Sequence, residues 1–120
     1  MESESLNNQF PRTARLLTPA QYSQVFASPT KFFQPGLLFL CRLNGLSYNR
    51  LGLAVSKKNQ PHAVDRNRVK RLIRESFRHQ LNDIGLDVVV LTRNPIVNMD
   101  NTQIFEQLDW LWQRAKKRDW

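Results

Sequence analysis

The sequence predicts an α+β domain with the element order α-β-β-β-α-β-α. Two observations support this prediction. Apolar residues recur with the period of an amphipathic helix in three stretches, and between these stretches they alternate or run continuously over short segments typical of strands. The length of 120 residues is enough for one hydrophobic core, and the sequence contains no internal repeat.

The first helix is expected to begin at Thr18. Thr18 can cap the helix, Pro19 suits its first position, and Gln21 can close a capping box. Ser28-Pro29 ends it. Before the helix, residues 1–9 are polar and acidic and are expected to form a disordered tail.

Three strands are expected next, at residues 31–33, 37–43 and 51–56. In the second strand one face is fully apolar and the other is partly so, which predicts a central strand covered on both sides. The third strand carries only small residues on one face, namely Gly52, Ala54 and Ser56. This face either lets a helix pack closely or leaves a shallow groove.

The second helix combines a core stripe with a strongly charged face. Asp65 is expected to cap it, and Gly85 to follow its end at about Asn82 or Ile84. Between Arg66 and Arg78 there are five arginines, one lysine and one glutamate. The apolar stripe is Val69, Leu72, Ile73 and Phe77, continued by Leu81 and Ile84. On the opposite face or at its border lie Arg68, Lys70, Arg71, Arg74 and Arg78, here called the basic ridge.

The basic ridge allows two interpretations. A helix face of mixed charge is usually just solvated, but here like charges at i,i+3 and i,i+4 repel one another unless an anion covers them. This favours a binding site for a polyanion. The net charge of +8 and the isoelectric point of about 10.4 imply a nucleic acid, an anionic membrane or acidic ligands as partner.

The chain is expected to end with a buried strand over residues 86–92 and a last helix. The strand follows a strand and a helix, so it should pair in parallel with a partner, by default through a right-handed crossover. Asp100 and Gln103 can form the capping box of the last helix, and Trp110 lies opposite its core stripe. Four basic residues end this helix, where the helix dipole alone accounts for them: Arg114, Lys116, Lys117 and Arg118.

No catalytic constellation is evident. The ten acidic residues are scattered, and Asp83 and Asp87 are expected to be surface turn residues. His62 and His79 lack the neighbours of a zinc helix, so no metal site is expected. Cys41 is the only cysteine and is expected to be buried, which makes a reducing cytoplasm the default location. No apolar run is long enough to span a membrane. The residues alone therefore predict binding of RNA or DNA without chemistry on the protein.

Tyr22 and Phe26 share one face of the first helix. They are either part of the core or a platform on which nucleic-acid bases stack.

The order and spacing of several blocks resemble the protein subunit of bacterial ribonuclease P. The most specific block is Arg66-Asn67-Arg68, which opens the basic stretch up to Arg78. The resemblance extends from about Phe10 to Lys117, and in the first helix Tyr22 stands where phenylalanine is common. The supporting blocks are Phe10-Pro11-Arg12, Arg15 to Thr18, the pair Tyr22 and Phe26, Leu51 to Leu53, Ser56 to Asn59, and Val88 to Val90.

The resemblance implies a fold like the second domain of ribosomal protein S5, with one RNA-binding domain over residues 10–120 and a left-handed crossover through the basic helix. It implies a subunit that joins a catalytic RNA and helps to remove the 5′ leader of precursor tRNA. The RNA would carry the chemistry and hold most of the magnesium ions. No catalytic residue, bound metal, membrane or obligate protein partner is expected for the protein itself.

The resemblance also implies roles for individual residues. The expected contacts to the catalytic RNA are Arg66, Asn67, Arg68, Lys70, Arg71 and Arg74. The expected contacts to the leader are Tyr22, Phe26, Ser56 and Lys57, and further RNA contacts are expected at Arg12, Arg15, Lys58 and Arg78. The alternatives are a ribosomal or other structural RNA-binding protein on the same fold, and a free-standing nuclease.

Overall fold

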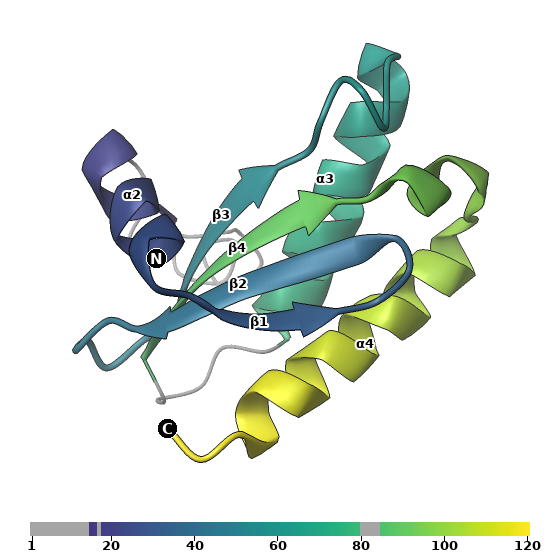
Figure 1. The fold of residues 1–120 in the computed structure, drawn as a ribbon. Coiled ribbons are helices and arrows are strands. Elements are labelled where there is room, and N and C mark those ends of the chain that lie inside the picture. Colours follow the sequence, from purple (N-terminus) through teal and green to yellow (C-terminus); the bar gives the residue numbers. More distant parts are fainter. Residues whose placement is uncertain (1–14, 17, 80–84) are drawn as a thin grey trace, which may run out of the picture.

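The computed structural model describes residues 15–16, 18–79 and 85–120 of the chain (Figure 1). The predicted order of helices and strands is confirmed, with an added 3-10 helix before the last α-helix. The tail, Arg12, Asp83 and the last predicted turn of the basic helix lie outside the described residues. The elements are α2 (Pro19–Ala27), β1 (Thr30–Phe33), β2 (Leu37–Leu43), β3 (Arg50–Ala54), α3 (Ala63–Arg78), β4 (Leu86–Thr92), η2 (Asn94–Asn98) and α4 (Asn101–Lys117).

The strands form one sheet in the order β1-β2-β4-β3. β2 pairs antiparallel with both β1 and β4, whereas β3 pairs in parallel with β4. The chain leaves β3, passes through α3 and returns as β4, so the predicted parallel pairing of the last strand is confirmed. The left-handed sense of this crossover stays a prediction.

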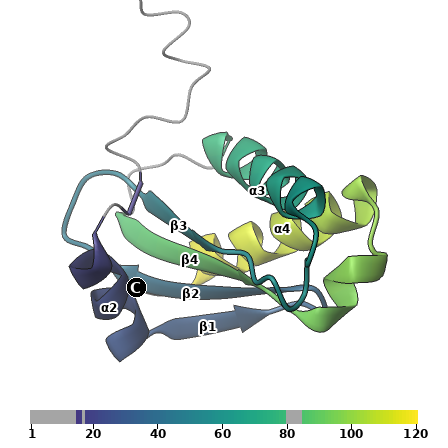
Figure 2. The same cartoon turned by 90° about the horizontal axis from the view of Figure 1, so that it is seen from above.

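The sheet separates two layers of helices, with α3 and α4 on one face and α2 on the other (Figure 2). The main core lies under α3 and α4. There the rings of Phe39 and Trp112 meet edge-on at 4.5 Å between centroids, and Trp112 Nε1 donates a hydrogen bond to Ser76 Oγ at 2.8 Å. A smaller core under α2 contains Leu16, Val25, Leu40 and Val89. β2 contributes to both cores, which confirms that it is central and covered on both sides.

α2 and α4 begin at the predicted capping boxes. Thr18 Oγ1 accepts a hydrogen bond from Gln21 N at 3.2 Å, and Thr18 N donates to Gln21 Oε1 at 3.1 Å. Asp100 and Gln103 exchange the same two hydrogen bonds, both at 2.9 Å. Each box satisfies backbone N–H groups that the first helical turn leaves unpaired.

The predicted cap of α3 is wrong. The helix begins at Ala63 with His62 at the N-cap position, and His62 makes no side-chain capping bond. Asp65 lies within the first turn, where an acidic side chain interacts favourably with the positive end of the helix dipole. Arg66 Nη1 donates hydrogen bonds to the carbonyls of Gln60 at 3.1 Å and Pro61 at 2.8 Å, and these bonds hold the residues just before the helix.

Two residues of the sheet, Cys41 and Asp87, are fully buried, although only one of them was expected to be. Cys41 is fully buried, as expected, and burial raises the pKa of its thiol to about 12. Asp87 was expected on a surface turn, but it is a fully buried residue of β4. The expectation failed because its ion-pair partner, Arg50, lies on another strand.

Candidate nucleic-acid interface

The side chains along α3 fall into two groups, those held by other parts of the protein and those left open. Arg66 holds the loop before the helix through Gln60 and Pro61. Arg68 Nη1 donates a hydrogen bond to Asn101 Oδ1 at the start of α4. Both arginines therefore fix the position of the helix, in addition to adding positive charge.

The open group consists of Asn67, Arg71 and Arg74, which are exposed. Within the described part of the chain their side chains make no hydrogen bond or ion pair. At the end of the helix Arg78 pairs with Glu75, and hydrogen bonds from Arg78 and His79 hold the pKa of Glu75 below its ordinary value. Positive charge without a partner is thus concentrated in the middle of α3.

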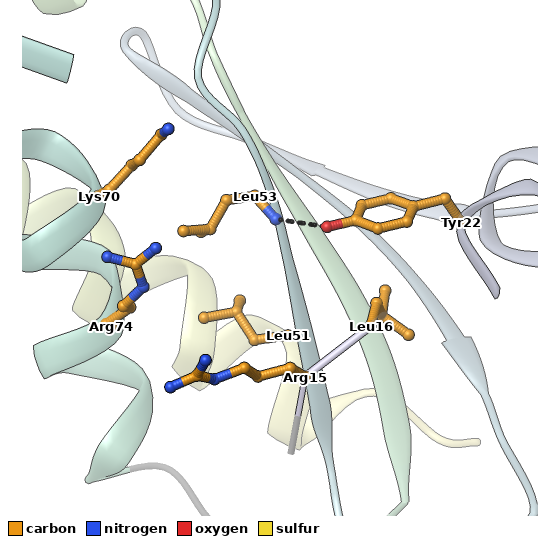
Figure 3. A pocket seen from close by; sticks show the side chains of 7 residues that line it. All are labelled: Arg15, Leu16, Tyr22, Leu51, Leu53, Lys70 and Arg74. Carbon is orange, nitrogen blue, oxygen red and sulfur yellow. Dashed lines mark hydrogen bonds between the residues drawn. The ribbon is translucent and has the colours of Figure 1, made fainter. Parts of the chain in front are cut away.

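A pocket of about 250 Å³ joins the basic ridge to α2 across the outer side of β3 (Figure 3). Lys70 and Arg74 reach it from α3, and Tyr22 reaches it from α2 (Figure 3). The full lining is Arg15, Leu16, Tyr22, Leu51, Leu53, Lys70 and Arg74, and we call this the β3-edge pocket. Three cations around an apolar floor suit a phosphate with its sugar.

Tyr22 is a wall of this pocket and also part of the fold. Its ring lies over Gly52, where an added Cβ would come within 2.6 Å of Tyr22 Cε1. The small-residue face of β3 therefore lets a helix pack closely, which was one of the two expectations. The Tyr22 hydroxyl accepts a hydrogen bond from Leu53 N at 3.3 Å. Leu16 N donates to Leu51 O at 3.0 Å, so both contacts cover the outer side of this edge strand.

Phe26 behaves differently from Tyr22, although both were predicted as a pair. Its side chain is 47% exposed, whereas Tyr22 is half-buried against the smaller core. The core interpretation thus fits Tyr22, whereas for Phe26, which is exposed, the platform interpretation stays a prediction.

An open row of apolar side chains crosses the sheet on the α2 face. The strand register aligns Phe33 with Leu38, Leu38 with Leu91, and Leu91 with Ala54. These four residues, here called the sheet row, are half-buried or exposed, whereas Leu40 and Val89 in the neighbouring row are buried beneath α2. The sheet row was not predicted from the sequence, where only the alternation within each strand hints at it.

A cation lies at the β1 end of the sheet row. The guanidinium carbon of Arg93 is 5.6 Å from the centroid of the Phe33 ring, and Arg93 Nη1 donates to Gln34 O at 2.8 Å. This contact favours a cation–π interaction that keeps Arg93 beside the row.

Ser56, Lys57 and Lys58 follow the other end of the row, because β3 ends at Ala54, earlier than predicted. Ser56 N donates to Thr92 Oγ1 at 3.1 Å, and Ser56 Oγ accepts from Lys58 N at 3.0 Å. The first bond ties the loop to β4, the second lies within the loop, and both lysines are exposed.

Residues 15–16, 18–79 and 85–120 contain no group of three His, Cys, Asp or Glu side chains that could hold a metal ion. Among the same residues, no helix is both long enough and apolar enough to cross a membrane.

The fold and this surface define a small, basic α+β protein with cations gathered along one helix. Comparison with known proteins gives the family. Residues 10–116 match the family model described as Ribonuclease P. The chain belongs to the ribonuclease P protein family.

The relatives cover nearly the whole chain. The ribonuclease P protein component of Chromohalobacter salexigens is 47% identical over 110 residues, which span 90% of this chain and 86% of the relative. That of Escherichia coli O157:H7 is 45% identical over 106 residues, spanning 88% and 89% of the two chains. The solved structure of the Staphylococcus aureus RNase P protein aligns with a TM-score of 0.79 at 30% identity, covering 86% of this chain and 95% of that one.

Proposed function

We propose that this chain is the protein subunit of ribonuclease P. It binds the catalytic RNA and the 5′ leader of precursor tRNA, and it assists the endonucleolytic cut that gives the mature tRNA its 5′ end. Family membership over residues 10–116 supports the proposal, as do the relatives named ribonuclease P protein component.

In this proposal the catalytic RNA docks on α3. Asn67, Lys70, Arg71 and Arg74 contact its phosphates and sugars, and a guanidinium can bind a phosphate through two parallel hydrogen bonds. Arg66 and Arg68 contribute charge while keeping the helix in place through their bonds to the preceding loop and to Asn101. Loss of either arginine would therefore act partly through the fold.

The leader of precursor tRNA lies on the α2 face of the sheet. A single strand presents unstacked bases, which aromatic and apolar side chains accept without strong sequence preference. Phe26 and the sheet row offer such a surface, and Lys57 and Arg93 are placed to meet backbone phosphates at its two ends. Ser56 shapes the loop that carries Lys57.

The observation that carries the proposal is the shared lining of the β3-edge pocket. Lys70 and Arg74 from the basic ridge and Tyr22 from α2 line the same cavity (Figure 3). From the sequence, the residues of the two surfaces were assigned to different partners. The pocket makes them neighbours, so the substrate strand can stay on positively charged surface as it passes from the catalytic RNA to the sheet.

The RNA performs the phosphodiester hydrolysis in this proposal, and magnesium ions held mainly by the RNA supply the metal chemistry. The protein contributes binding energy and charge neutralisation. Its cations replace counterions around crowded phosphates, which lowers the magnesium concentration that the assembly needs.

Reconstitution tests the proposal. The protein alone should not cleave precursor tRNA, but it should stimulate a bacterial ribonuclease P RNA at low magnesium concentration, and more strongly for a substrate with a leader. Cleavage by the protein without RNA would instead indicate a free-standing nuclease. Binding to RNA without any stimulation would indicate a structural RNA-binding protein.

A further inference from the structure

A second pocket, of about 230 Å³, lies where the last turn of α4 meets β1. It is lined by Phe32, Arg114, Lys117 and Arg118, and we call it the α4-end pocket. β1 and β3 are opposite edges of the sheet, so this pocket is separate from the β3-edge pocket. From the sequence, its cations were attributed to the helix dipole alone.

Aromatic rings hold two of these cations in place. The guanidinium carbon of Arg114 is 5.4 Å from the centroid of the Trp110 ring, and that of Arg118 is 5.0 Å from the centroid of the Trp120 ring. A guanidinium stacked on a ring keeps its N–H donors at its rim, available to an anion in the same plane. The stacking reduces the freedom that each arginine would lose on binding.

Trp120 is itself fixed, which makes the pocket a formed site. Its Nε1 donates a hydrogen bond to Ala115 O at 2.8 Å, satisfying a carbonyl that the end of α4 leaves unpaired. Its ring meets Phe32 edge-on, with 6.5 Å between centroids. Phe32 thus forms an apolar wall opposite the positively charged end of α4.

The positive charge that lines the pocket is larger than the helix dipole can account for. The C-terminal end of a helix carries about half a negative charge, whereas three cations line this cavity. Among the described residues, none of the three takes part in an ion pair, although Asp119 is adjacent to Arg118 in the sequence. Such a cluster is stabilised when an anion covers it.

We propose that the α4-end pocket is a second RNA contact, which binds a backbone phosphate through Arg114, Lys117 and Arg118 and places the adjoining sugar or base against Phe32. The identity of the anion as RNA rests on the proposed function. RNA fits better than a lipid surface, because the three cations line one cavity together with Phe32, which suits a single phosphate and its sugar or base.

Paired single variants give a matched test. Lys117→Gln and Lys116→Gln each remove one charge from the last turn of α4, but only Lys117 lines the pocket. The affinity of each variant for ribonuclease P RNA is measured over a series of salt concentrations, together with that of the double variant Lys117→Gln/Arg118→Gln. Thermal melting followed by circular dichroism verifies that every variant is folded.

The expected result is a smaller salt dependence for the pocket variants. The slope of log affinity against log salt should decrease by about 0.7–0.9 for each phosphate that the variant no longer neutralises, and Lys116→Gln should retain the wild-type slope. Equal slopes for Lys116→Gln and Lys117→Gln, with the double variant unchanged, would overturn the inference and leave the proposed function intact.

Two further measurements distinguish a failure of the proposed function from a failure of the inference about the pocket. If the wild-type protein does not bind the catalytic RNA, the proposed function fails. Titration with a short oligouridylate then shows whether the α4-end pocket binds an RNA strand. A smaller slope for the pocket variants on that strand supports the inference, and no binding or an unchanged slope overturns it. Binding to phosphatidylserine vesicles that the double variant loses, while its RNA slopes stay unchanged, would overturn it in favour of a membrane contact.

Discussion

Arg50 on β3 and Asp87 on β4 are register partners whose side chains form a two-point ion pair. Arg50 Nε donates to Asp87 Oδ1 at 2.8 Å, and Arg50 Nη2 donates to Oδ2 at 2.7 Å. Asn44 Nδ2 adds a third hydrogen bond, at 2.8 Å to Oδ1. The hydrogen bond with Asp87 raises the pKa of Arg50, so the guanidinium stays charged at neutral pH. The pair joins the two parallel strands at the end of the sheet where β3 begins.

Arg50→Ala should therefore destabilise the fold more than Asp87→Asn. The Asp87 side chain is 0% exposed, so loss of Arg50 leaves a buried carboxylate without its cation. We expect a loss of roughly 3 kcal/mol in the free energy of unfolding, measured by urea denaturation. Arg42→Ala is the control, because Arg42 faces Asp87 from β2 but bonds to Gln24 and to its neighbouring carbonyl. Equal losses for Arg42→Ala and Arg50→Ala would contradict the assigned pair.

Phe26→Ala should reduce the preference for a precursor with a leader and leave stability nearly unchanged. Stacking of one base on an aromatic ring contributes about 1–3 kcal/mol. The measurement compares the affinity of the reconstituted enzyme for precursor and mature tRNA. Leu46→Ala serves as the control, since Leu46 is also exposed but lies in the loop between β2 and β3. A leader preference that survives Phe26→Ala would count against Phe26 as part of the leader site.

Tyr22→Phe should have the opposite effects to Phe26→Ala: it should lower stability and leave leader binding unchanged. The ring over Gly52 is kept, so leader binding should persist, but the hydrogen bond from Leu53 N is removed. We expect a decrease of about 1 kcal/mol in the free energy of unfolding, from urea denaturation. Tyr22→Ala should cost more, because it also leaves a gap over Gly52. Unchanged stability of Tyr22→Phe would show that the hydroxyl does not matter to the edge strand.

Arg71→Ala should weaken assembly with the catalytic RNA without affecting the fold. Its side chain is exposed and makes no hydrogen bond or ion pair with another described residue. The salt dependence of assembly should fall by about 0.7–0.9 in slope. Arg68→Ala should also lower the free energy of unfolding, because Arg68 bonds to Asn101. Filter binding and urea denaturation of the two variants separate these effects, with the exposed Lys31→Ala as the charge control.

Cys41 should resist alkylation by iodoacetamide in the folded protein at pH 8. Burial raises the pKa of its thiol to about 12, and the reactive form is the thiolate. Because the folded pKa lies above the unfolded value of about 8.5, the thiol contributes stability below that pH, and the contribution is lost as the pH rises toward the folded value. The urea midpoint should therefore fall less between pH 7 and pH 10.5 in Cys41→Ala than in the wild type. Rapid native labelling at pH 8 would contradict the burial.

The sequence predicted those parts of the fold that local signals determine. The capping boxes of Thr18 and Asp100 involve residues three positions apart, and the alternation in β2 reports its two covered faces. The expectations for Asp65 and Asp87 were wrong because each depends on particular side-chain contacts that the pattern of residue types does not show. Arg66 reaches back to Pro61 just before α3, and the burial of Asp87 depends on Arg50, 37 residues away in the sequence.

The same limit applies to the candidate site. Helical periodicity identified the basic ridge, but it could not divide the ridge into residues that hold the fold and residues that remain open. That division depends on Asn101 at the start of α4, and the sheet row depends on the register of four strands. The β3-edge pocket could not be predicted, because its lining comes from helices on both faces of the sheet.

The covering of the outer side of β3 also bears on how the protein behaves before it meets RNA. A free strand edge invites pairing with the same edge of another copy, and such pairing leads to aggregation or strand-swapped dimers. Leu16 and the Tyr22 hydroxyl occupy positions that a second copy would need on Leu51 and Leu53. These two contacts therefore protect the outer edge of β3 from pairing with a second copy of the chain.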